Sequence, residues 1–401
     1  MNFDVTIVGA GIVGLATALQ LKKSMPHLKI AVIEKESKVA SHQTGNNSGV
    51  IHSGIYYKPG SLKAKNCIEG YHLIIDFCKE HNIPYELCGK IIVATKEEEL
   101  PALENIFDRG VENGLQGLKY LSPEEILQRE PKTVGIKGIF VPQTGIVDYK
   151  VVAKKYAEVF EKLGGELFLN TKVVRVKNYG NFIQIRTDRM DIESGLMINC
   201  AGLYCDKIAA QTQRNLDLKI IPFRGEYYAL KTEKSSMVTN LIYPVPDPNF
   251  PFLGVHFTRR IDGLIEAGPN AVLAFKREGY KKSHINFVEL WESIAWPGFI
   301  KVAKKYWKTG FGEMHRSFSK AAFTKALQKL IPDIKSEDLV PGGAGVRAQA
   351  CDRNGGLIDD FYIKETPREI HVLNAPSPAA TSSLAIGKTI AELAIKQIES
   401  F

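Results

Sequence analysis

The first 34 residues carry the feature that most limits how this chain can fold. An apolar run, Val5 to Val8, is typical of a buried parallel strand and leads directly into the turn Gly9-Ala-Gly-Ile-Val-Gly14. Apolar residues at helical spacing follow, and a second apolar strand, Lys29 to Ile33, ends in Glu34. This order of strand, turn, helix, strand and acid predicts a βαβ unit opening a doubly wound α/β domain.

Each glycine of the turn stands where a side chain would obstruct the fold or a ligand. Gly9 suits the tight turn, Gly11 the place where backbone meets a pyrophosphate, and Gly14 the contact between helix and strand. The helix N-terminus offers N–H groups to phosphates, and Glu34 is placed to accept hydrogen bonds from a ribose diol. Glycine-rich turns also arise for conformational reasons alone, but the complete order of elements favours a dinucleotide site.

Size and composition are those of an ordinary globular protein. At 401 residues the chain can hold two domain-sized cores. Its net charge of +8 comes without a lysine or arginine block, which argues against nucleic acid and favours anionic substrates or an anionic membrane surface as partners. The 6 cysteines show no zinc-like spacing, so we expect no metal site and a cytoplasmic protein with reduced thiols. No apolar segment approaches the roughly 20 residues that cross a bilayer, so any contact with the inner face of the cell membrane would be peripheral.

Patterns typical of nucleotide-binding elements return later in the chain. The apolar strand Leu196-Met-Ile-Asn-Cys-Ala-Gly202 ends in small residues, as expected where a sheet edge approaches a bound nucleotide. Short strands with many prolines run from Ile220 to about Ile265, and mostly helical sequence follows. We therefore expect two interleaved domains: a Rossmann-like nucleotide-binding domain (1–88, 145–219 and 340–401) and an α+β substrate domain with a mixed or antiparallel sheet (89–144 and 220–339, with a helical insertion at about 276–329).

The stretch from Ser41 to Tyr57 is polar, rich in glycine and too long for a simple turn. Loops of this composition carry function more often than packing, and the small residues let the backbone pass close to a flat cofactor ring. The alternative is a plain surface loop, which is less favoured because Val50, Ile51 and Ile55 indicate a segment that turns inward.

Further motifs, spread over nearly the whole length, resemble one known family. They are His42-Gln-Thr-Gly with Asn47-Ser-Gly-Val-Ile-His52, Gly145-Ile-Val-Asp-Tyr149, Pro222-Phe-Arg-Gly-Glu-Tyr227, Phe252-Leu-Gly-Val-His256, Gly268-Pro-Asn-Ala-Val-Leu-Ala-Phe-Lys-Arg277, Gly345-Val-Arg-Ala-Gln-Ala350 and Asn374-Ala-Pro-Ser-Pro-Ala-Ala-Thr381. With these motifs the chain resembles the D-amino-acid oxidase-like family of FAD-dependent oxidoreductases, and within it the L-2-hydroxyglutarate dehydrogenase/oxidase subfamily.

The resemblance implies FAD bound between the two domains and oxidation of L-2-hydroxyglutarate to 2-oxoglutarate by hydride transfer to flavin N5. It places the cofactor on Gly9, Gly11, Gly14, Glu34, Lys35, Asn47, Ser48, Val173, Ala201, Gly202, Pro378, Ala379, Ala380 and Thr381. The last four would lie at the N-terminus of the final helix, where a helix dipole stabilises negative charge on the reduced flavin. Where the subfamily usually has histidine this chain has Asn46, which can form hydrogen bonds but cannot titrate near neutral pH.

Oxidation of a hydroxy acid requires a base for the hydroxyl proton, and a neutral histidine has a pKa near the working pH. His52 and His256 are the candidates. His256 is slightly ahead because it ends an apolar run, Phe252 to Val255, that can deliver it into a pocket. For each of them, a hydrogen-bonded structural histidine is an equal alternative before the family resemblance is counted.

Arginine suits the anchors of a dicarboxylate because its planar fork pairs with a carboxylate in bidentate fashion. Arg224 and Arg347 stand in apolar or glycine-rich surroundings, where an unpaired arginine is costly. Their structural alternative is an ion pair with a nearby carboxylate such as Glu226. Tyr227 and Tyr228 alternate on a strand, so only one can face the pocket, and we name Tyr228 as the hydroxyl donor to the substrate.

The segment Gly342-Gly-Ala-Gly345 lacks the strand, helix and terminal acid of a second dinucleotide fingerprint. Electrons are therefore expected to enter from the substrate and leave to oxygen, a quinone or a carrier protein. Two alternatives stay open: a family member acting on another hydroxy acid, glycerol phosphate or a secondary amine, and a sensor that holds FAD without turnover.

A basic amphipathic stretch follows Pro297. Apolar residues at helical spacing there oppose four lysines, Lys301, Lys304, Lys305 and Lys308. All three tryptophans of the chain, Trp291, Trp296 and Trp307, lie in the same region of the sequence. Such a helix suits contact with a membrane surface, where a quinone is available. An ordinary helix that packs its apolar side on the core is the favoured alternative.

Overall fold

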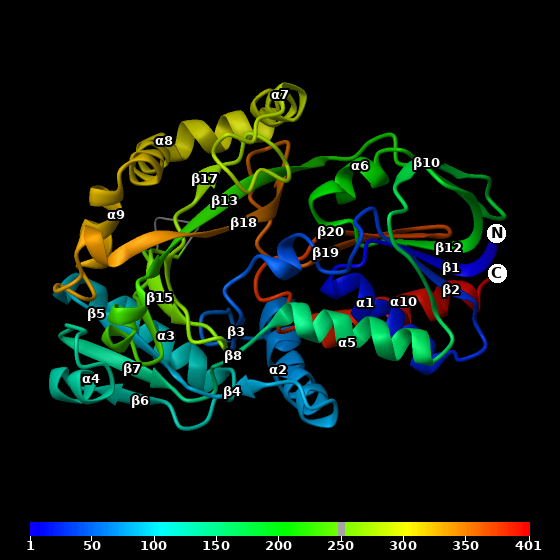
Figure 1. The fold of residues 1–401 in the computed structure, drawn as a ribbon. Coiled ribbons are helices and arrows are strands. Elements are labelled where there is room, and N and C mark those ends of the chain that lie inside the picture. Colours follow the sequence, from blue (N-terminus) through cyan, green and yellow to red (C-terminus); the bar gives the residue numbers. More distant parts are fainter. Residues whose placement is uncertain (248–252) are drawn as a thin grey trace.

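The computed structural model describes residues 1–247 and 253–401 and consists of two bodies joined by long strands (Figure 1). One body holds both termini and is built on a sheet with a parallel centre, whereas the other is built on a mixed sheet with mostly antiparallel pairs. Phe252, the first residue of the apolar run that precedes His256, lies outside the described residues.

The first sheet has the strand order β10-β11-β12-β1-β2-β9, and β20 and β19 continue it beside β12. Its strands are β1 (Asn2–Val8), β2 (Ile30–Ile33), β9 (Glu166–Phe168), β10 (Val173–Asn178), β11 (Ile183–Thr187), β12 (Asp191–Asn199), β19 (Tyr362–Thr366) and β20 (Glu369–Asn374). β1 pairs in parallel with β12 on one side and β2 on the other, and Val5 to Val8 are buried. The buried parallel strand predicted there is confirmed.

Helices cover one face of this sheet: α1 (Ile12–Ser24), α2 (Leu62–Glu80), α5 (Tyr149–Lys162) and α10 (Ser383–Ile398). α1 packs against both α5 and α10, and their apolar sides join the strands in one continuous core. A Cβ added to Gly387 would lie 2.7 Å from the backbone carbonyl carbon of Ala16. Only glycine at this position therefore allows the first and last helices to approach so closely. The opposite face packs on α6 (Cys205–Ala209) and the hairpin of β10 and β11.

The second sheet has the order β17-β13-β16-β15-β14-β5-β7-β6, with β18 also paired to β13. Its strands are β5 (Lys90–Ala94), β6 (Lys119–Leu121), β7 (Lys137–Val141), β13 (Leu218–Leu230), β14 (Leu241–Pro244), β15 (His256–Arg259), β16 (Ile265–Gly268), β17 (Val272–Leu273) and β18 (Leu339–Asp352). One face packs on α9 (Lys320–Leu327) through Ile242, Phe257 and Phe323. Because side chains alternate along strands, Tyr243, His256 and Tyr227 lie on the other face, toward the first body.

The remaining elements complete the second body and the junction. A three-stranded sheet of β3 (Val50–Ile51), β8 (Gly145–Val147) and β4 (Tyr85–Glu86) lies where the bodies meet. α3 (Leu100–Glu112) and α4 (Pro123–Arg129) pack beside β7, and α7 (Phe287–Ile294) and α8 (Pro297–Phe318) lie near β13, β17 and β18.

The ladder of β13 and β18 crosses two of the boundaries expected from the sequence. It runs from Leu218 opposite Asp352 to Leu230 opposite Leu339. Residues 340–352, which the sequence pattern placed in the nucleotide-binding domain, therefore belong to the second sheet, and the first sheet resumes only at β19. In Figure 1 this ladder runs from the second sheet toward the first body.

Candidate active site and cofactor cleft

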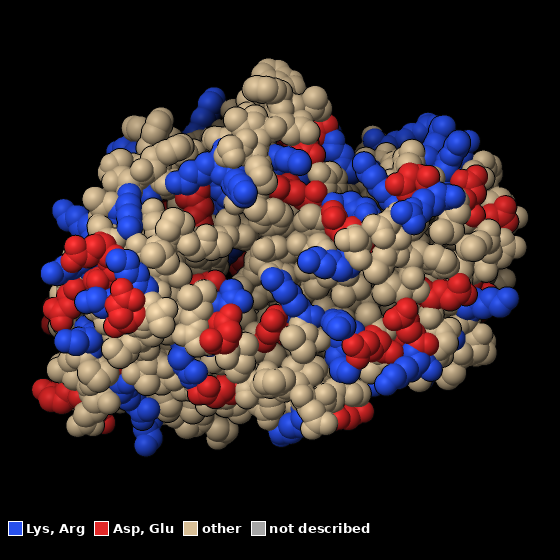
Figure 2. All heavy atoms as spheres, in the orientation of Figure 1, with Lys and Arg blue, Asp and Glu red and all other residues tan. Residues whose placement is uncertain are grey.

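A cavity of about 940 Å³ lies between the two bodies. Its walls come from the turn after β1, the loop before β3, the strand end before α6, the turn before α10, and β13 with β18. The face of the molecule drawn in Figure 2 is hollowed near its centre, and acidic and basic side chains are interspersed around the hollow. The cavity thus joins elements from the start, middle and end of the chain, as the sequence pattern indicated.

The turn between β1 and α1 forms a backbone cradle at one wall. Gly9 has a φ of +106°, and a Cβ there would lie 2.5 Å from the carbonyl oxygen of Cys200. A Cβ on Gly14, which lies behind the cavity wall, would be 2.1 Å from the oxygen of Gly9. Gly11 caps α1 without a side-chain hydrogen bond, and its own Cβ position points into open space apart from Thr44 Oγ1 at 3.5 Å. The N–H of Ile12 donates to Thr44 Oγ1 (3.0 Å), and the N-terminus of α1 beside Gly11 still fits a pyrophosphate through its other N–H groups.

The carboxylate of Glu34 stands at the end of β2 and lines the cavity. It accepts hydrogen bonds from the backbone N–H groups of Ala10 (2.9 Å) and Glu36 (3.0 Å), which fix its orientation. All other residues proposed for the cofactor, except Gly14, also line the cavity: Gly9, Gly11, Lys35, Asn47, Ser48, Val173, Ala201, Gly202, Pro378, Ala379, Ala380 and Thr381. Their side chains and backbone are therefore compatible with a bound dinucleotide running along this wall.

The loop before β3 is held by its asparagines. Asn47 donates to the carbonyl oxygens of Gln43 (3.2 Å) and Thr44 (2.7 Å) and accepts from the N–H of Gly49 (2.9 Å). Asn46 donates to the carbonyl oxygens of Ser41 (3.1 Å) and His42 (2.7 Å). The amide at the position where the subfamily usually has histidine is thus engaged in shaping the loop.

The segment 378–381 forms a turn that precedes α10 by two residues. The hydroxyl of Thr381 shares a hydrogen bond with the hydroxyl of Tyr149 (2.8 Å) and accepts one from the N–H of His52 (3.1 Å). These contacts tie the turn before the last helix to the loop that carries His52.

The two candidate bases differ in their access to the cavity. His52 lines it, whereas His256 does not. The ring of His256 lies 4.0 Å from that of Tyr243 and its Nδ1 is 2.9 Å from the carbonyl oxygen of Gly254. Burial, together with the nearby charges of Lys90 and Arg347, lowers the pKa of His52 to about 3; burial also lowers the pKa of His256 to about 4. Both imidazoles are therefore neutral at physiological pH.

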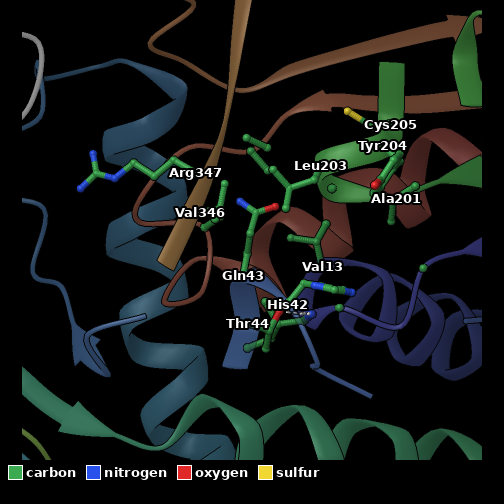
Figure 3. Close-up of a pocket in the computed structure, with 18 of the residues that line it drawn as sticks. Val13, His42, Gln43, Thr44, Ala201, Leu203, Tyr204, Cys205, Val346 and Arg347 are labelled. Carbon is green, nitrogen blue, oxygen red and sulfur yellow. Dashed lines mark hydrogen bonds between the residues drawn. The ribbon is translucent and has the colours of Figure 1, made fainter. Parts of the chain in front are cut away.

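Arg347 lines the cavity and Arg224 does not. In Figure 3 Arg347 projects from β18 on the side of the view away from Ala201 and Tyr204. The guanidinium of Arg224 is buried and pairs with Glu226, with Nη2 at 2.8 Å and Nε at 3.0 Å from Oε1. The structure thus favours the ion pair considered above as the alternative for Arg224, and does not support Arg224 as a substrate anchor.

The structure also does not bring Tyr228 to the cavity. Its ring packs edge-on against Phe323, with centroids 4.9 Å apart, whereas Tyr227 lines the cavity. Strand alternation was the right signal, but the phase was reversed because the face with Tyr228 packs on α9. Lys63, which also lines the cavity, was missed, and so was Lys90, although a lysine at the head of the apolar run Lys90 to Ala94 is a usable signal.

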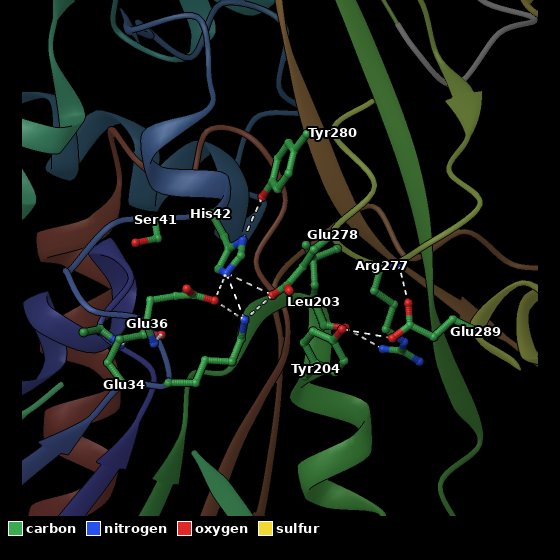
Figure 4. Close-up of polar contacts among 12 residues, drawn as sticks. Glu34, Glu36, Ser41, His42, Leu203, Tyr204, Arg277, Glu278, Tyr280 and Glu289 are labelled. Carbon is green, nitrogen blue, oxygen red and sulfur yellow. Dashed lines mark hydrogen bonds and ion pairs between the residues drawn. The ribbon is translucent and has the colours of Figure 1, made fainter. Parts of the chain in front are cut away.

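A cluster of charged groups lines the cavity beside Glu34 (Figure 4). Lys35 Nζ lies 2.6 Å from Glu278 Oε1, 2.5 Å from Glu36 Oε1 and 3.0 Å from His42 Nε2. His42 Nε2 is itself 2.9 Å from Glu36 and 3.0 Å from Glu278, and its Nδ1 is 3.1 Å from the hydroxyl of Tyr280. Three of these side chains, Glu36, His42 and Glu278, are spaced as metal ligands can be, and the ammonium of Lys35 contacts all three. We call these five residues the clasp.

Protonation within the clasp follows its charges. Burial lowers the pKa of His42, but hydrogen bonds to Glu278 and Glu36 outweigh burial and raise it overall. Burial raises the pKa of Glu278, but His42 and Lys35 outweigh it and bring the value to about 2. Beside the clasp, buried Arg277 pairs with Asp206 through two hydrogen bonds of 2.5 and 2.8 Å. The segment 277–280 of the second body is thereby fixed to the first.

Comparison with known proteins decides the family. A family model described as FAD dependent oxidoreductase matches residues 4–393. The chain belongs to this family. Membership confirms the oxidoreductase class, the mixed α/β fold and the FAD cofactor that the sequence led us to expect, and the glycine cradle described above fits that cofactor.

Relatives in the family are similar over their full length. L-2-hydroxyglutarate dehydrogenase of Indibacter alkaliphilus is 63% identical over 398 residues, which cover 99% of this chain and 100% of the relative. The enzyme of the same name from Escherichia coli O17:K52:H18 is 45% identical over 389 residues, covering 97% and 92%. These matches confirm the resemblance to the L-2-hydroxyglutarate dehydrogenase subfamily.

Solved structures share the family fold. FAD-bound L-alpha-glycerophosphate oxidase of Mycoplasma pneumoniae superimposes with a TM-score of 0.79 at 24% identity, covering 100% of this chain and 95% of that one. Glycine oxidase of Geobacillus kaustophilus gives a TM-score of 0.70 at 17% identity, covering 99% and 95%. Among the described residues, no helix combines the length and the apolar character needed to cross a bilayer.

Proposed function

We propose that this chain oxidises L-2-hydroxyglutarate to 2-oxoglutarate with FAD and passes the electrons to a quinone or another acceptor at a membrane surface. One observation carries the proposal: a single cavity joins the glycine cradle to an end lined by His52, Lys63 and Arg347. Cationic side chains beside a cofactor cleft match a dicarboxylate, and the full-length relatives bear the name of this activity.

Bound FAD supplies the acceptor for the hydride that leaves the carbinol carbon. Arg347 is expected to hold one carboxylate, because a guanidinium pairs with both oxygens at once. Lys63 also lines the cavity, and the carboxylate of Asp359, 2.8 Å from its Nζ, offsets its charge. Tyr227 is expected to donate its hydroxyl proton to the substrate in a hydrogen bond, because burial raises its pKa to about 12 and keeps it protonated.

His52 is the better candidate for the base because it lines the cavity and His256 does not. In the absence of substrate its pKa is low, and a neutral imidazole has a free lone pair to receive the hydroxyl proton. A bound dicarboxylate brings two negative charges near this ring and raises its pKa toward the working range. Proton acceptance by His52 is thereby coupled to substrate binding. His256, which does not line the cavity, is expected to lie behind His52 and help to hold its ring.

An anaerobic reduction experiment tests the substrate. Purified FAD-bound protein is mixed with L-2-hydroxyglutarate, its D enantiomer, glycerol 3-phosphate, lactate or sarcosine, and bleaching of the flavin absorbance is followed. We expect rapid bleaching with L-2-hydroxyglutarate alone. Faster bleaching by another compound would assign the chain to that substrate, and no bleaching by any of them would favour a sensor.

The same assay tests the anchor. Arg347→Ala removes a charge-assisted bidentate contact and should lower kcat/KM by about tenfold to a hundredfold. The matched control is Arg353→Ala, an exposed arginine on the same stretch of chain that pairs with Asp217 at 3.6 Å. An equal effect of both variants would remove Arg347 from the substrate site.

The proposed membrane contact involves the outer surface of α7 and α8. Large apolar side chains are exposed there, including Phe287 (80%), Trp291 (67%), Trp307 (55%) and Phe311 (71%). The tip that α7 forms at the top of Figure 2 is largely free of charged side chains. The four lysines of α8 predicted to oppose the apolar residues are all exposed. Apolar side chains that enter a bilayer and lysines that meet lipid phosphates fit an anionic membrane surface.

Vesicle flotation tests this contact. The protein should float with vesicles containing phosphatidylglycerol, less so with purely zwitterionic ones, and binding should weaken at high salt. Trp291→Ser with Trp307→Ser should abolish flotation, whereas Leu127→Ser, an exposed leucine on α4, should not change it. If the double variant floats as well as the parent, the surface of α7 and α8 is not the contact.

A further inference from the structure

Lys90 is a buried cation that the described reaction does not yet use. It is the first residue of β5 and only 1% exposed. Its Nζ lies 4.5 Å from the ring centroid of Tyr56 and 5.0 Å from that of Tyr243. Within 1–247 and 253–401, its ammonium group has no hydrogen-bond or carboxylate partner. Burial of an ammonium group without an anion costs free energy, so a function that offsets this cost would explain a lysine at this position.

The groups around Lys90 make the surroundings more positive. The charge of Lys90 lowers the pKa of both His52 and His256. The charges of Arg347 and Lys63, which line the cavity, lower the pKa of His52 further. Cys67 on α2 is the only described ionisable group that favours the charged lysine, and burial raises the pKa of that thiol to about 12, so it stays neutral. The hydroxyl of Tyr56 is buried and lacks a hydrogen-bond partner among the described residues.

The position of Lys90 relative to the cavity follows from its neighbours. His52 lines the cavity, whereas Lys90 does not, and the ring of Tyr243 that contacts Lys90 also contacts His256. Lys90 therefore lies behind the two histidines, on the side of the second sheet. A charge in this dry layer is poorly screened by water and reaches the cavity through the histidines.

We propose that Lys90 is a positioning residue that acts through the layer of His52 and His256: its ammonium supplies the positive potential that draws a substrate carboxylate to this end of the cavity. The inference rests on the proposed dicarboxylate substrate and deepens it. An anion bound in front of the histidines supplies the negative charge that the lysine lacks, and a monocarboxylate or a neutral amine gains less from it. Lys90 thereby contributes to selection of a diacid.

The proposal has a pH signature, because burial lowers the pKa of Lys90 to about 7. Above this value the amine is neutral and the attraction is lost. His52 and His256 remain neutral above their pKa values of about 3 and about 4. Cys67, Tyr56 and Tyr243 stay protonated because burial raises their pKa values. Between about pH 6 and 8.5, Lys90 is thus the group of this cluster that titrates.

The test measures binding of 2-oxoglutarate to the oxidised, FAD-bound protein by calorimetry at about pH 6 and about pH 8.5, where both of its carboxylates are ionised. For the parent protein we expect the dissociation constant to rise by about tenfold with pH. Lys90→Met keeps the length of the side chain and removes the charge. It should bind weakly at both pH values, with the pH dependence gone.

Lys22→Met is the matched control, because Lys22 is also buried but donates to the carbonyl oxygens of Pro26 (2.9 Å) and Leu28 (2.7 Å), away from the cavity. It should retain the pH dependence of the parent. If Lys90→Met keeps that dependence, or if the parent binds equally at both pH values, the role of Lys90 is overturned. If the parent neither binds 2-oxoglutarate nor is reduced by L-2-hydroxyglutarate, the proposed function itself fails, which is a separate outcome.

Discussion

Single residues along β13 illustrate how a strand distributes its side chains between a site and a core. Tyr227 lines the cavity, whereas its neighbour Tyr228 packs on Phe323 of α9. Two guanidinium nitrogens of Arg224 donate to Glu226, so this arginine pairs within its own strand and does not bind a ligand. The period of two is visible in the sequence, but its phase depends on α9, which begins about a hundred residues later.

Exchange of the two tyrosines for phenylalanine separates their roles. Tyr227→Phe removes a hydroxyl from the cavity and should lower kcat/KM for L-2-hydroxyglutarate by about tenfold, the cost of a hydrogen bond to a charged partner. Tyr228→Phe should change kcat/KM less than about twofold, since its hydroxyl contacts no cavity wall. Steady-state kinetics of both variants decide the point, and equal losses would contradict the assignment.

Among the elements, the crossing of α1 and α10 depends most directly on one residue type. Gly387 lets the backbone of α10 touch that of α1 at Ala16. Gly310, in α8, has no heavy atom within 4 Å of the place where a Cβ would stand. Gly387 is thus required by a close contact between helices, whereas no contact of this kind requires glycine at position 310.

Alanine at these two positions should have opposite effects. Gly387→Ala forces the helices apart and should lower the free energy of unfolding by about 1–3 kcal/mol. Gly310→Ala restricts the unfolded chain without a clash and should raise it by about 0.5–1 kcal/mol. Urea denaturation followed by circular dichroism measures both, and a destabilising Gly310→Ala would show that α8 needs its glycine.

The elements that the sequence predicted well are those encoded by neighbouring residues. The unit from Val5 to Glu34 follows from local periodicity and turn glycines, and the structure confirms it. The ladder of β13 and β18 joins segments more than a hundred residues apart, so no local pattern marks it. Lys90 does carry a local signal at the head of a buried strand, but its neighbours Tyr56 and Tyr243 are distant in sequence, so its environment could not be predicted.

At the scale of the whole molecule, the clasp fixes the second body to the end of β2. Its members come from the first body, except Glu278 and Tyr280. Because these ion pairs join the two bodies across the cleft, separating the bodies requires breaking contacts between charged groups. We therefore expect the strength of the clasp to depend on pH and ionic strength.

The pH dependence of the clasp has two limbs. The pKa of Glu278 is depressed to about 2, so its contribution is present above the ordinary value of 4.5 and is lost as the pH falls through about 2. The pKa of His42 is raised, so its contribution is complete below 6.5 and is lost as the pH rises through the raised value. The clasp is strongest between these limbs.

A comparison with His42→Gln tests the upper limb. The parent should exceed His42→Gln in free energy of unfolding at about pH 5.5, and the difference should shrink at about pH 9. His72→Gln, an exposed histidine on α2, is the control and should give no such difference. Chemical denaturation at both pH values measures the difference, and a gap that widens as the pH rises would contradict a raised pKa for His42.

The contact between α1 and α10 also governs how the protein is made. A ribosome releases the residues of α1 first and those of α10 last, about 20–80 s apart at about 5–20 residues per second. Throughout that interval the side of α1 that α10 covers in the finished fold lacks this partner. We therefore expect a chain that ends before α10 to contain the nucleotide cradle but to leave the apolar side of α1 uncovered, and so to be more easily cleaved by proteases than the full chain.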